Sequence, residues 1–478
     1  MEQDGREGAR PVYVLGAGFS KAISHLMPVT SDLGDQIRSR LSGVVDVRLR
    51  REQSFEQWLT LQLTPMPFLQ AFENTRRAAD GERVIAAIAE VLDDYVSQVT
   101  AAPLPEWLGQ LIAIWHQERA AVLTFNYDTL VERAVNALPP VVHRGNSTLQ
   151  ILGDHVTYPA PAAPPAQIMG DTGSPHVRDS LQLLHLHGSL AWYWSSSDAS
   201  GSTLIRVRER GALGGDSLYG SDDDFNATHT LDRYLIPPVT SKEGYYGSYL
   251  AVSIWRAAKE LMERASSLNI LGYSLPLEDR AASQLFTHFP KHLTSRVADH
   301  NPGTAESGEG IVGHLATLGI GSQVDARGAN AISEFVARKL DQAIIAVSQA
   351  TAFTEFSRRG VDVVVALGGA WGSAEPTDLY LLVRERDGAY EARKIESSWT
   401  WGGNSTISFR ERMLNMQTLG DTALDDFLTV DSLYSKVSSG EAFAFFDSLR
   451  IRQYVVIGVE KATLGGLDVL VVSTAPVG

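Results

Sequence analysis

The run from Val12 to Ser20, Val-Tyr-Val-Leu-Gly-Ala-Gly-Phe-Ser, constrains the fold more than any other part of the chain. Its Val-rich start predicts a buried strand, and Gly16 and Gly18 allow a tight turn into a helix that opens near Ser20. Unpaired N–H groups and the helix dipole would form an anion site there, for which a nucleotide pyrophosphate is the natural occupant. The run lacks the third glycine of the usual dinucleotide fingerprint, and a strand can also turn into a helix this way with nothing bound.

Apolar runs alternate with helical stretches over the chain up to about residue 300. Strands are predicted at 12–15, 121–125, 181–187, 269–271 and 296–298. Helices are predicted at 31–41, 83–99, 107–118, 128–135, 249–266 and 277–287. This alternation indicates a Rossmann-like α/β fold, a mostly parallel sheet with helices on both faces. Such sheets bind ligands at the carboxyl ends of their strands, so the informative side chains should follow the strands.

Composition excludes several classes of function. The chain has 478 residues, no cysteine and a net charge of −15. Without cysteine there is no disulfide, no thiol nucleophile and no cysteine-ligated zinc, and an acidic surface repels nucleic acid. The absence of a long apolar run and the polar N-terminus predict a cytoplasmic protein without membrane contact. The acidic run at 222–224 is interpreted as solvated loop rather than as a metal site.

The length leaves room for two or three domains. Residues 1–305 are predicted to form the α/β domain, and 306–350 a linker with a connecting helix, because the stretch 303–328 is Gly-rich. Residues 351–478 are predicted to form a smaller α+β domain, with strands at 361–367, 379–384, 454–459 and 469–473. This domain carries little recognisable chemistry, so a role in sensing or assembly is expected.

Polar side chains follow the second predicted strand. Asn126 and Asp128 stand at its turn, where an amide can bond sugar hydroxyls or a water. Asp128 can instead cap the following helix through backbone N–H groups, which is the better interpretation of that residue alone. Asn126 has no such local duty, and the sequence therefore favours it as a functional residue.

Two histidines and two hydroxyl or amide residues follow the later strands. His185 and His187 alternate with leucines, which predicts that they share one strand face and that one of them is structural. His187 precedes Gly188 at the strand end, so it is the better candidate for a base, although a lone strand histidine is more often a core residue. Ser274 can bond a ribose or phosphate or form an ordinary Ser-Pro turn, and Asn301 can be a turn former or a ribose ligand.

In this order and at this spacing, the segments resemble the sirtuin family, in its bacterial defence branch, over roughly residues 10–305. The elements that match are the phosphate loop at Gly16, Ala17, Gly18 and Ser20, the Asn-x-Asp element at Asn126 and Asp128, the catalytic His-Gly at His187 and Gly188, and the elements for the ribose and adenine end of NAD at Gly272, Ser274 and Asn301. Further residues that resemble the defence branch are Ile236, Pro237, Pro238, Lys242 and Trp255.

The chain departs from the deacylase members of that family at three places. Deacylase sirtuins have a Gln before the catalytic Asn, where this chain has Phe125. They have a Pro-Asp-Phe-Arg loop, where this chain reads Met-Pro-Val-Thr at 27–30, and a four-cysteine zinc module that is missing here. The resemblance therefore implies hydrolysis of NAD+ rather than acyl-lysine transfer, and no zinc.

The resemblance implies an NAD+ glycohydrolase that releases nicotinamide and ADP-ribose, an NAD-depleting effector of anti-phage defence held inactive until triggered. Asn126 would place the attacking water and bond a ribose hydroxyl, His187 would accept a proton, and Asp128 would orient Asn126 and the ribose. Expected partners are NAD+, further copies of the chain, and a defence-system protein or a phage-derived trigger. The alternatives are a non-catalytic subunit that binds NAD or ADP-ribose and, third, a protein deacylase.

Overall fold

The computed structural model describes most of the chain up to residue 342 and the strands beyond it. The described residues are 9–51, 53–137, 141–143, 147–149, 156–158, 180–195, 204–206, 231–240, 242, 244–276, 279–342, 363–368, 378–384, 390–395, 414–418, 438, 443–447, 452–464 and 467–476. The acidic run at 222–224 lies outside them.

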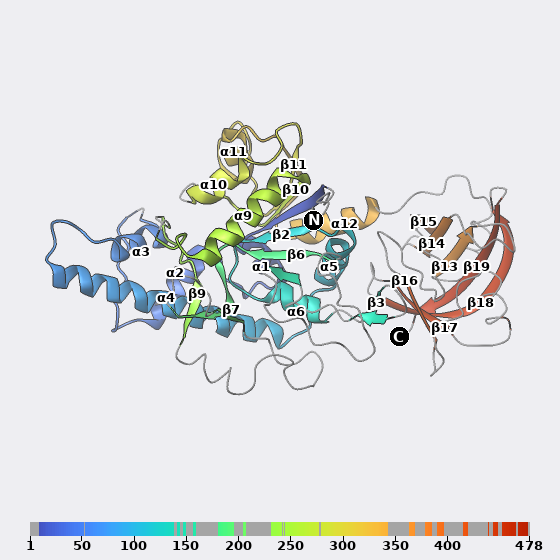
Figure 1. Ribbon diagram of the computed structural model, residues 1–478, viewed down its shortest axis with the longest axis horizontal. Coiled ribbons are helices and arrows are strands. Elements are labelled where there is room, and N and C mark those ends of the chain that lie inside the picture. The colour runs from blue at the N-terminus through green and yellow to red at the C-terminus, as the bar shows by residue number, and fades with distance from the viewer. Residues whose placement is uncertain are drawn as a thin grey trace, which may run out of the picture.

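A seven-stranded sheet forms the centre of the molecule, in the spatial order β12-β11-β10-β1-β2-β6-β5 (Figure 1). Its strands are β1 Arg10–Leu15, β2 Ala121–Thr124, β5 Thr157–Tyr158, β6 Gln182–His185, β10 Ala265–Leu271, β11 Ser295–Asp299 and β12 Ser322–Arg327. All neighbouring pairs are parallel, which confirms the predicted Rossmann-like α/β fold. The chain leaves β1 toward β2 on one side and returns to β10 on the other, and such a reversal of strand order is where these sheets bind ligands.

Alternate residues of β1 face two separate cores. Tyr13 and Leu15 pack into one apolar cluster and Val12 and Val14 into the other. The first face is covered by α1 Ala17–Ile23, α5 Glu106–Glu118, α6 Leu130–Ala137 and α12 Ala331–Gln342, and the second by α9 Tyr249–Glu263, α10 Arg280–Phe286 and α11 Gly310–Thr317. Because both faces are covered, β1 is apolar throughout its buried part instead of alternating with polar residues.

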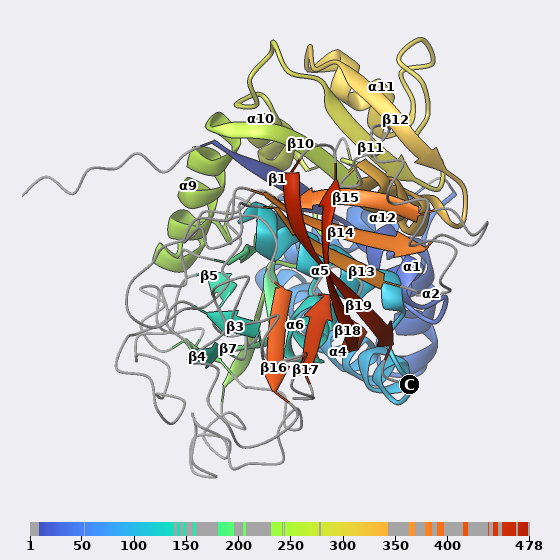
Figure 2. The same ribbon diagram turned by 90° about the vertical axis from the view of Figure 1, so that its right-hand side faces the viewer.

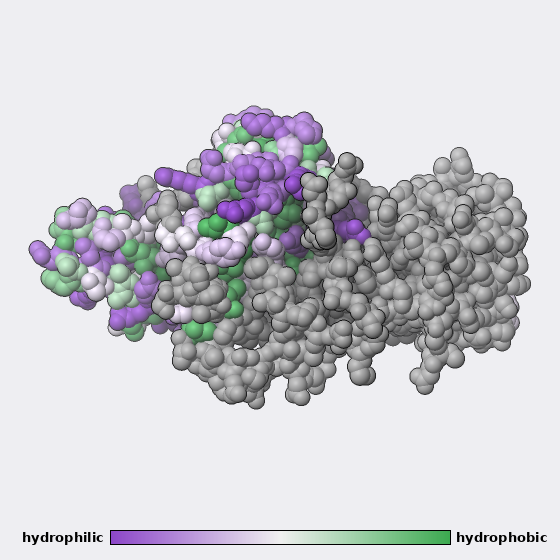
Figure 3. Space-filling model, viewed as in Figure 1, coloured by the Kyte–Doolittle hydropathy of each residue, from purple (hydrophilic) through white to green (hydrophobic). Residues whose placement is uncertain are grey.

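Three helices form an extension at the left of Figure 1, and they are α2 Thr30–Arg40, α3 Phe55–Leu63 and α4 Ala71–Thr100. The sequence predicts only part of it, because the first turns of α4 are polar. That helix starts early because the Glu73 carboxylate accepts the Gln70 N–H at 2.8 Å. Apolar and polar residues are interspersed on this extension (Figure 3), and the side chains of Phe68 and Phe72 are exposed.

The stretch 306–342 belongs to the central sheet, so the predicted linker is wrong for these residues. They form α11, the edge strand β12 and α12, which packs on β11 and β12. The glycines that suggested a linker serve tight turns instead, since Gly303 and Gly310 have φ values of +71° and +66°. The predicted connecting helix corresponds to α12.

A second seven-stranded sheet, antiparallel throughout, has the order β15-β14-β13-β19-β18-β17-β16 (Figure 2). Its strands are β13 Val363–Gly368, β14 Asp378–Arg384, β15 Tyr390–Ile395, β16 Leu414–Thr418, β17 Phe443–Asp447, β18 Arg452–Leu464 and β19 Leu467–Pro476. Four of them overlap the strands predicted for this part. Two small antiparallel sheets complete the set, from β7 Gly188–Trp194, β8 Ile205–Arg206 and β9 Asp232–Leu235, and from β3 Val141–His143 and β4 Ser147–Leu149. None of the described helices is long and apolar enough to cross a bilayer.

Candidate functional site

The turns that follow β1 and β10 interlock through their backbones. The Gly16 N–H donates to the Leu271 carbonyl at 3.3 Å, and the Gly18 N–H donates to the Gly272 carbonyl at 2.9 Å. A Cβ on Gly16 would lie 2.6 Å from the Gly272 oxygen, and Gly272 itself has a φ of +61°. Only glycine fits these positions, because a side chain would collide with the opposite backbone.

The interlock changes the anion site that the sequence predicts at this turn. We expected unpaired N–H groups there, and this is wrong for Gly16 and Gly18, whose N–H groups already donate to β10 and the turn after it. Helix α1 begins at Ala17, with Gly16 as its N-cap residue and no side chain capping it. The glycines thus bring two strand ends into backbone contact. A ligand can approach the backbone of this turn closely, but the N–H groups of Gly16 and Gly18 are not free to bind it.

Asn126 is held from several sides at the carboxyl end of β2. Its Nδ2 donates to the Gly16 carbonyl at 2.8 Å and to the Ser20 hydroxyl at 2.9 Å, while its backbone N–H donates to Thr124 Oγ1 at 3.1 Å. A carbonyl oxygen can only accept, so the amide nitrogen must face Gly16 and both of its hydrogens are used. The Oδ1 of Asn126 is left without a hydrogen bond from any described residue and remains an acceptor for a ligand or a water.

Asp128 supports Asn126 through Ser20. The Ser20 hydroxyl donates to Asp128 Oδ2 at 2.6 Å, and the other carboxylate oxygen accepts the Leu130 N–H at 3.2 Å where α6 begins. The capping role considered for Asp128 is therefore present together with the link to the glycine turn. Burial raises the pKa of Asp128, although its bonds to Ser20 and Leu130 act the other way. Ser20 is itself buried with its hydroxyl committed, so it acts on a ligand through Asn126.

His185 fixes the backbone of the same asparagine. Its Nδ1 lies 3.2 Å from the Asn126 carbonyl oxygen and its Nε2 lies 2.7 Å from Glu132 Oε1, with the ring fully buried. Both nitrogens face acceptors, so only a doubly protonated ring satisfies both contacts. Burial alone would lower the pKa of His185, but Glu132 and the Asn126 carbonyl outweigh it and raise that pKa.

His187 lies in the turn between β6 and β7, beyond the end of the strand. The prediction that it shares a strand face with His185 is wrong, because β6 ends at His185 and Gly188, with a φ of +84°, turns the chain. The His187 carbonyl accepts the Ile236 N–H at 2.8 Å, which ties the turn to the segment after β9. The two histidines therefore have separate surroundings.

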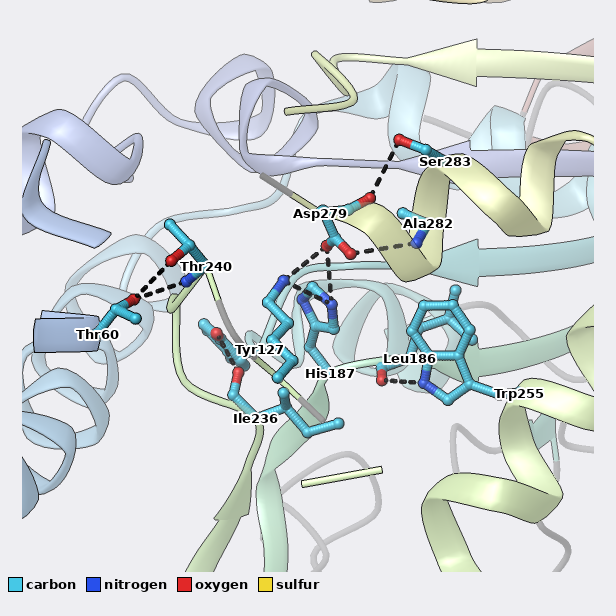
Figure 4. Close-up of polar contacts among 11 residues, drawn as sticks. Thr60, Tyr127, Leu186, His187, Ile236, Thr240, Trp255, Asp279, Ala282 and Ser283 are labelled. Carbon is cyan, nitrogen blue, oxygen red and sulfur yellow. Dashed lines mark hydrogen bonds and ion pairs between the residues drawn. The ribbon is translucent and has the colours of Figure 1, made fainter. Parts of the chain in front are cut away.

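Aromatic rings surround the His187 imidazole. The ring centroids of Phe125, Tyr127 and Trp255 lie 5.0, 6.4 and 6.3 Å from it. Trp255 is anchored by its Nε1, which donates to the Leu186 carbonyl at 3.1 Å, and the Tyr127 hydroxyl donates to the Ile236 carbonyl at 2.6 Å (Figure 4). Phe125 thus forms part of an apolar wall that removes water from His187.

Lys242 and Asp279 complete the surroundings of His187. The Asp279 Oδ2 lies 2.7 Å from Lys242 Nζ and 3.2 Å from His187 Nε2, and Lys242 Nζ lies 3.3 Å from the same Nε2 (Figure 4). Burial and Lys242 lower the pKa of His187, against the bond to Asp279. Burial alone would raise the pKa of Asp279, but His187 and Lys242 outweigh it and hold that pKa well below its ordinary range.

Sequence reasoning missed two carboxylates at this site. Asp279 falls inside the helix predicted at 277–287, and in the structure it is the N-cap residue of α10, where it accepts the Ala282 N–H at 3.1 Å. Glu132 reads as an ordinary residue of a helix. The sequence places no carboxylate near either histidine, yet in the structure Glu132 contacts His185 and Asp279 contacts His187. Both carboxylates lie at or near the start of a helix that follows a strand, and this position is the sequence feature that could have pointed to them. Lys242 was noted only through the family resemblance.

Ser274 and Asn301 lie after β10 and β11 with exposed side chains. The Ser274 backbone carbonyl lies 3.1 Å from His314 Nδ1, and the Asn301 N–H donates to Asp299 Oδ1 at 2.9 Å. Neither side chain forms a hydrogen bond with Asn126 or His187 within the described part of the chain. The nearby Leu275 has a φ of +49°, a strained value for a residue with a branched side chain, and such strain gathers at functional sites.

The described residues contain no group of three or more His, Asp or Glu side chains that could hold a metal ion.

Similarity to known proteins is found among solved structures, whereas no family model and no curated protein matches this chain. A Sir2 homologue in complex with NAD is 16% identical and covers 70% of this chain and 89% of its own, with a TM-score of 0.35. A structure described as a basis for the mechanism and regulation of Sir2 enzymes is 13% identical over 70% of this chain and 94% of its own, with a TM-score of 0.32. The fold assignment rests on the strand order and pairing of this chain itself.

Proposed function

We propose that this chain is an NAD+ glycohydrolase. The observation that carries the proposal is Asn126, which is fixed at the carboxyl end of β2 with its Oδ1 available, directly against the glycine turn. His187, a buried histidine of lowered pKa, lies in the turn just after the neighbouring strand β6. An acceptor and a neutral base on adjacent strand ends are what hydrolysis of a glycosidic bond needs. The resemblance of these motifs to sirtuins supports NAD+ as the molecule cleaved.

The reaction consumes one water and forms nicotinamide, ADP-ribose and a proton. The bond from the ribose carbon to the positively charged nicotinamide nitrogen breaks, and its electron pair neutralises that nitrogen. Asn126 Oδ1 accepts a hydrogen bond from the attacking water or a ribose hydroxyl, and His187 takes up the proton that is released. Phe125 and Trp255 keep bulk water from the histidine.

The residues that hold NAD+ in this proposal line the strand ends. The turn at Gly16, Ala17 and Gly18 and the adjoining Gly272 leave room for close approach of the pyrophosphate, with Ser20 beneath it. Gly188 keeps the turn of His187 in place, and Ser274 and Asn301 present exposed side chains toward the ribose and adenine end. NAD+ is a substrate here, and the mechanism requires no metal.

The same proposal extends to the biological role. The chain is a cytoplasmic, NAD-depleting effector of anti-phage defence, assembled from several copies and held inactive until a phage-derived trigger or a partner protein acts. Residues 351–478 sense the trigger or mediate assembly. The resemblance to the defence branch supports this, as do the replaced motifs of deacylase sirtuins and the acidic surface, which disfavours nucleic acid.

The test is NAD+ turnover by the full-length protein in its triggered state, with nicotinamide and ADP-ribose separated by chromatography. Asn126→Ala and His187→Ala should each reduce turnover about 100-fold or more, the usual effect of losing a general base or its positioning. His288→Ala is the matched control, because His288 lies in an exposed pair with Glu263 away from the site. Wild-type turnover by both site variants would refute the assignment.

The alternatives give different results in the same assay. A non-catalytic subunit binds NAD+ or ADP-ribose in calorimetry but forms no nicotinamide, and a deacylase forms nicotinamide only when an acyl-lysine peptide is present. For the defence role, cells that carry the wild type should lose NAD+ after phage infection, and cells that carry His187→Ala should keep it. Equal NAD+ levels in both strains during infection would remove the defence role.

A further inference from the structure

Three buried groups meet at one nitrogen of His187. The Asp279 Oδ2, the Lys242 Nζ and the His187 Nε2 lie within 3.3 Å of one another, and each of the three residues is at most 9% exposed. The tightest of the contacts is the Lys242–Asp279 ion pair at 2.7 Å. His187 therefore faces a cation and an anion that balance each other, rather than a lone charge.

The contacts decide which ring nitrogen carries the proton. A neutral imidazole holds one proton, and two groups compete at Nε2: Lys242 Nζ, which can only donate, at 3.3 Å, and the Asp279 carboxylate, which can accept the ring proton, at 3.2 Å. Lys242 already donates to Asp279 at 2.7 Å, the shortest contact of the three. No described residue offers Nδ1 a hydrogen-bond acceptor. The proton is therefore favoured on Nε2, and Nδ1 keeps the lone pair of a base.

The other groups packed around His187 do not change this balance. In the described part of the chain, the titratable side chains facing it are Lys242 before α9, Asp279 at the start of α10 and Tyr127 after β2, with Tyr273 after β10 stacked on Phe125 at 4.3 Å. Burial raises the pKa of both tyrosines well above its ordinary value, so they stay neutral. Among the described residues, Lys242 and Asp279 are left to set the charge at the imidazole.

Both residues are themselves held in place. Asp279 uses its second oxygen to cap α10 at Ala282, and its backbone carbonyl accepts the Ser283 hydroxyl at 3.1 Å (Figure 4). Thr240, two positions before Lys242, is tied to the extension, because its N–H and its Oγ1 lie 2.7 and 3.1 Å from the Thr60 hydroxyl. The cation and the anion, paired at 2.7 Å, orient the imidazole between them.

We propose that Asp279 and Lys242 are positioning residues for His187, in which Asp279 holds the ring proton on Nε2 and Lys242 keeps a second proton off the ring. Nδ1 is then the nitrogen that takes the proton during hydrolysis. The role in turnover rests on the proposed function, whereas the protonation of His187 is a property of the resting protein. The two are tested by separate measurements.

The variants are chosen to keep the fold. Asp279→Asn keeps an oxygen to cap α10 but places an NH2 group where His187 needs an acceptor. Lys242→Met removes the charge and keeps the apolar stem, and Lys242→Arg restores the charge. Asp325→Asn is the control, because it alters a carboxylate that pairs with Arg296 at 2.7 Å between β11 and β12, away from His187.

Histidine-selective NMR in the absence of NAD+ reports the tautomer and the pKa of His187, with the signal assigned from His187→Gln. Lys242→Met should raise the pKa of His187 by about one pH unit, and Lys242→Arg should restore it. Asp279→Asn should move the proton from Nε2 to Nδ1. Unchanged tautomer and pKa in Asp279→Asn and Lys242→Met, with the fold intact by circular dichroism, would overturn the proposal.

Turnover then tests the consequence. In kcat/KM for NAD+, Lys242→Met should move the acid limb of the pH profile up by about one pH unit, and Asp279→Asn should lower kcat roughly 100-fold. Asp325→Asn should leave the profile in place. A wild type that releases no nicotinamide in the triggered state refutes the proposed function, while the NMR result still decides how His187 is held. Altered NMR with an unmoved pH profile refutes the role of the two residues in turnover.

Discussion

His185 and His187 stand two positions apart and behave in opposite ways. His185 has an oxygen acceptor at each ring nitrogen, Glu132 and the Asn126 carbonyl, and its pKa is raised. His187 lies among aromatic rings with Asp279 and Lys242 at one nitrogen, and its pKa is lowered. His185 is suited to fix the Asn126 backbone and Glu132 as a positively charged ring, and His187 is suited to accept a proton.

The difference teaches that the partners, and not the local sequence, set the charge of each ring. Both rings are deeply buried, so desolvation acts on both in the same direction. The contrast comes from side chains that other elements bring in, since Glu132 lies on α6 and Asp279 at the start of α10. Three variants or conditions separate the two environments.

The largest effect is expected from Gly188→Ala, which breaks the turn of His187 alone. Gly188 has a φ of +84°, and an added Cβ would overlap the Tyr234 carbonyl oxygen. The free energy of unfolding should fall by about 3 kcal/mol, while the NMR pKa of His185 stays raised. Gly43→Ala is the control, because Gly43 has a φ of +81° with nothing within 4 Å and should cost about 1 kcal/mol. Equal losses of unfolding free energy for Gly188→Ala and Gly43→Ala in urea titration would contradict the predicted collision with the Tyr234 carbonyl.

A smaller loss is expected from Glu132→Gln, which acts on the His185 side. The Glu132 Oε1 bond to His185 becomes neutral, the pKa of His185 should fall, and unfolding should become easier by about 2 kcal/mol. Glu263→Gln serves as the comparison, since its exposed pairs with Lys259 and His288 should contribute less than about 1 kcal/mol. If the pKa of His185 does not move while that of His187 does, the two environments are not separate.

The smallest effect is the pH dependence of stability, which has opposite sign for the two rings. The raised pKa of His185 gives stability that is complete below its unfolded pKa of about 6.5 and is lost as pH rises through the folded pKa. The lowered pKa of His187 gives stability that is present above about 6.5 and is lost as pH falls. Urea titrations between pH 5 and 9 should therefore show His185→Gln losing the alkaline dependence and His187→Gln the acid dependence, each a change of about 1 kcal/mol. The same change in both variants would contradict the contrast.

Much of the parallel sheet could be predicted because its central strands are uninterrupted apolar runs. Residues of β1, β2 and β6 are buried on both faces, and such runs bounded by turns are readable without an alignment. The edge strand β12 reads Ser-Gln-Val-Asp-Ala-Arg and is only half buried, so it has no such pattern. Without an apolar run to mark this strand, the glycines before it favour a linker when the sequence is considered alone.

The part of the candidate site that could be predicted is the set of residues that directly follow a strand. Asn126 and His187 follow strands directly, and the parallel register brings strand ends to one edge. Their partners could not be predicted, because Glu132 and His185 are 53 positions apart and Lys242 and Asp279 are 37 apart. Helix-starting carboxylates have a local explanation as caps, which hides a second contact that only the fold creates.

The interlocked glycine turns also bear on how the chain is synthesised. Strand β1 needs β10 as its neighbour, and Asn269 of β10 contacts the Val12 carbonyl across 257 positions. At a synthesis rate of about 5–20 residues per second, the apolar edge of β1 waits on the order of ten to fifty seconds for its partner. An unpaired apolar edge is a template for aggregation. The ribosome-bound half-chain is therefore the state of this protein that most needs protection, and fragments that end before β10 should be insoluble.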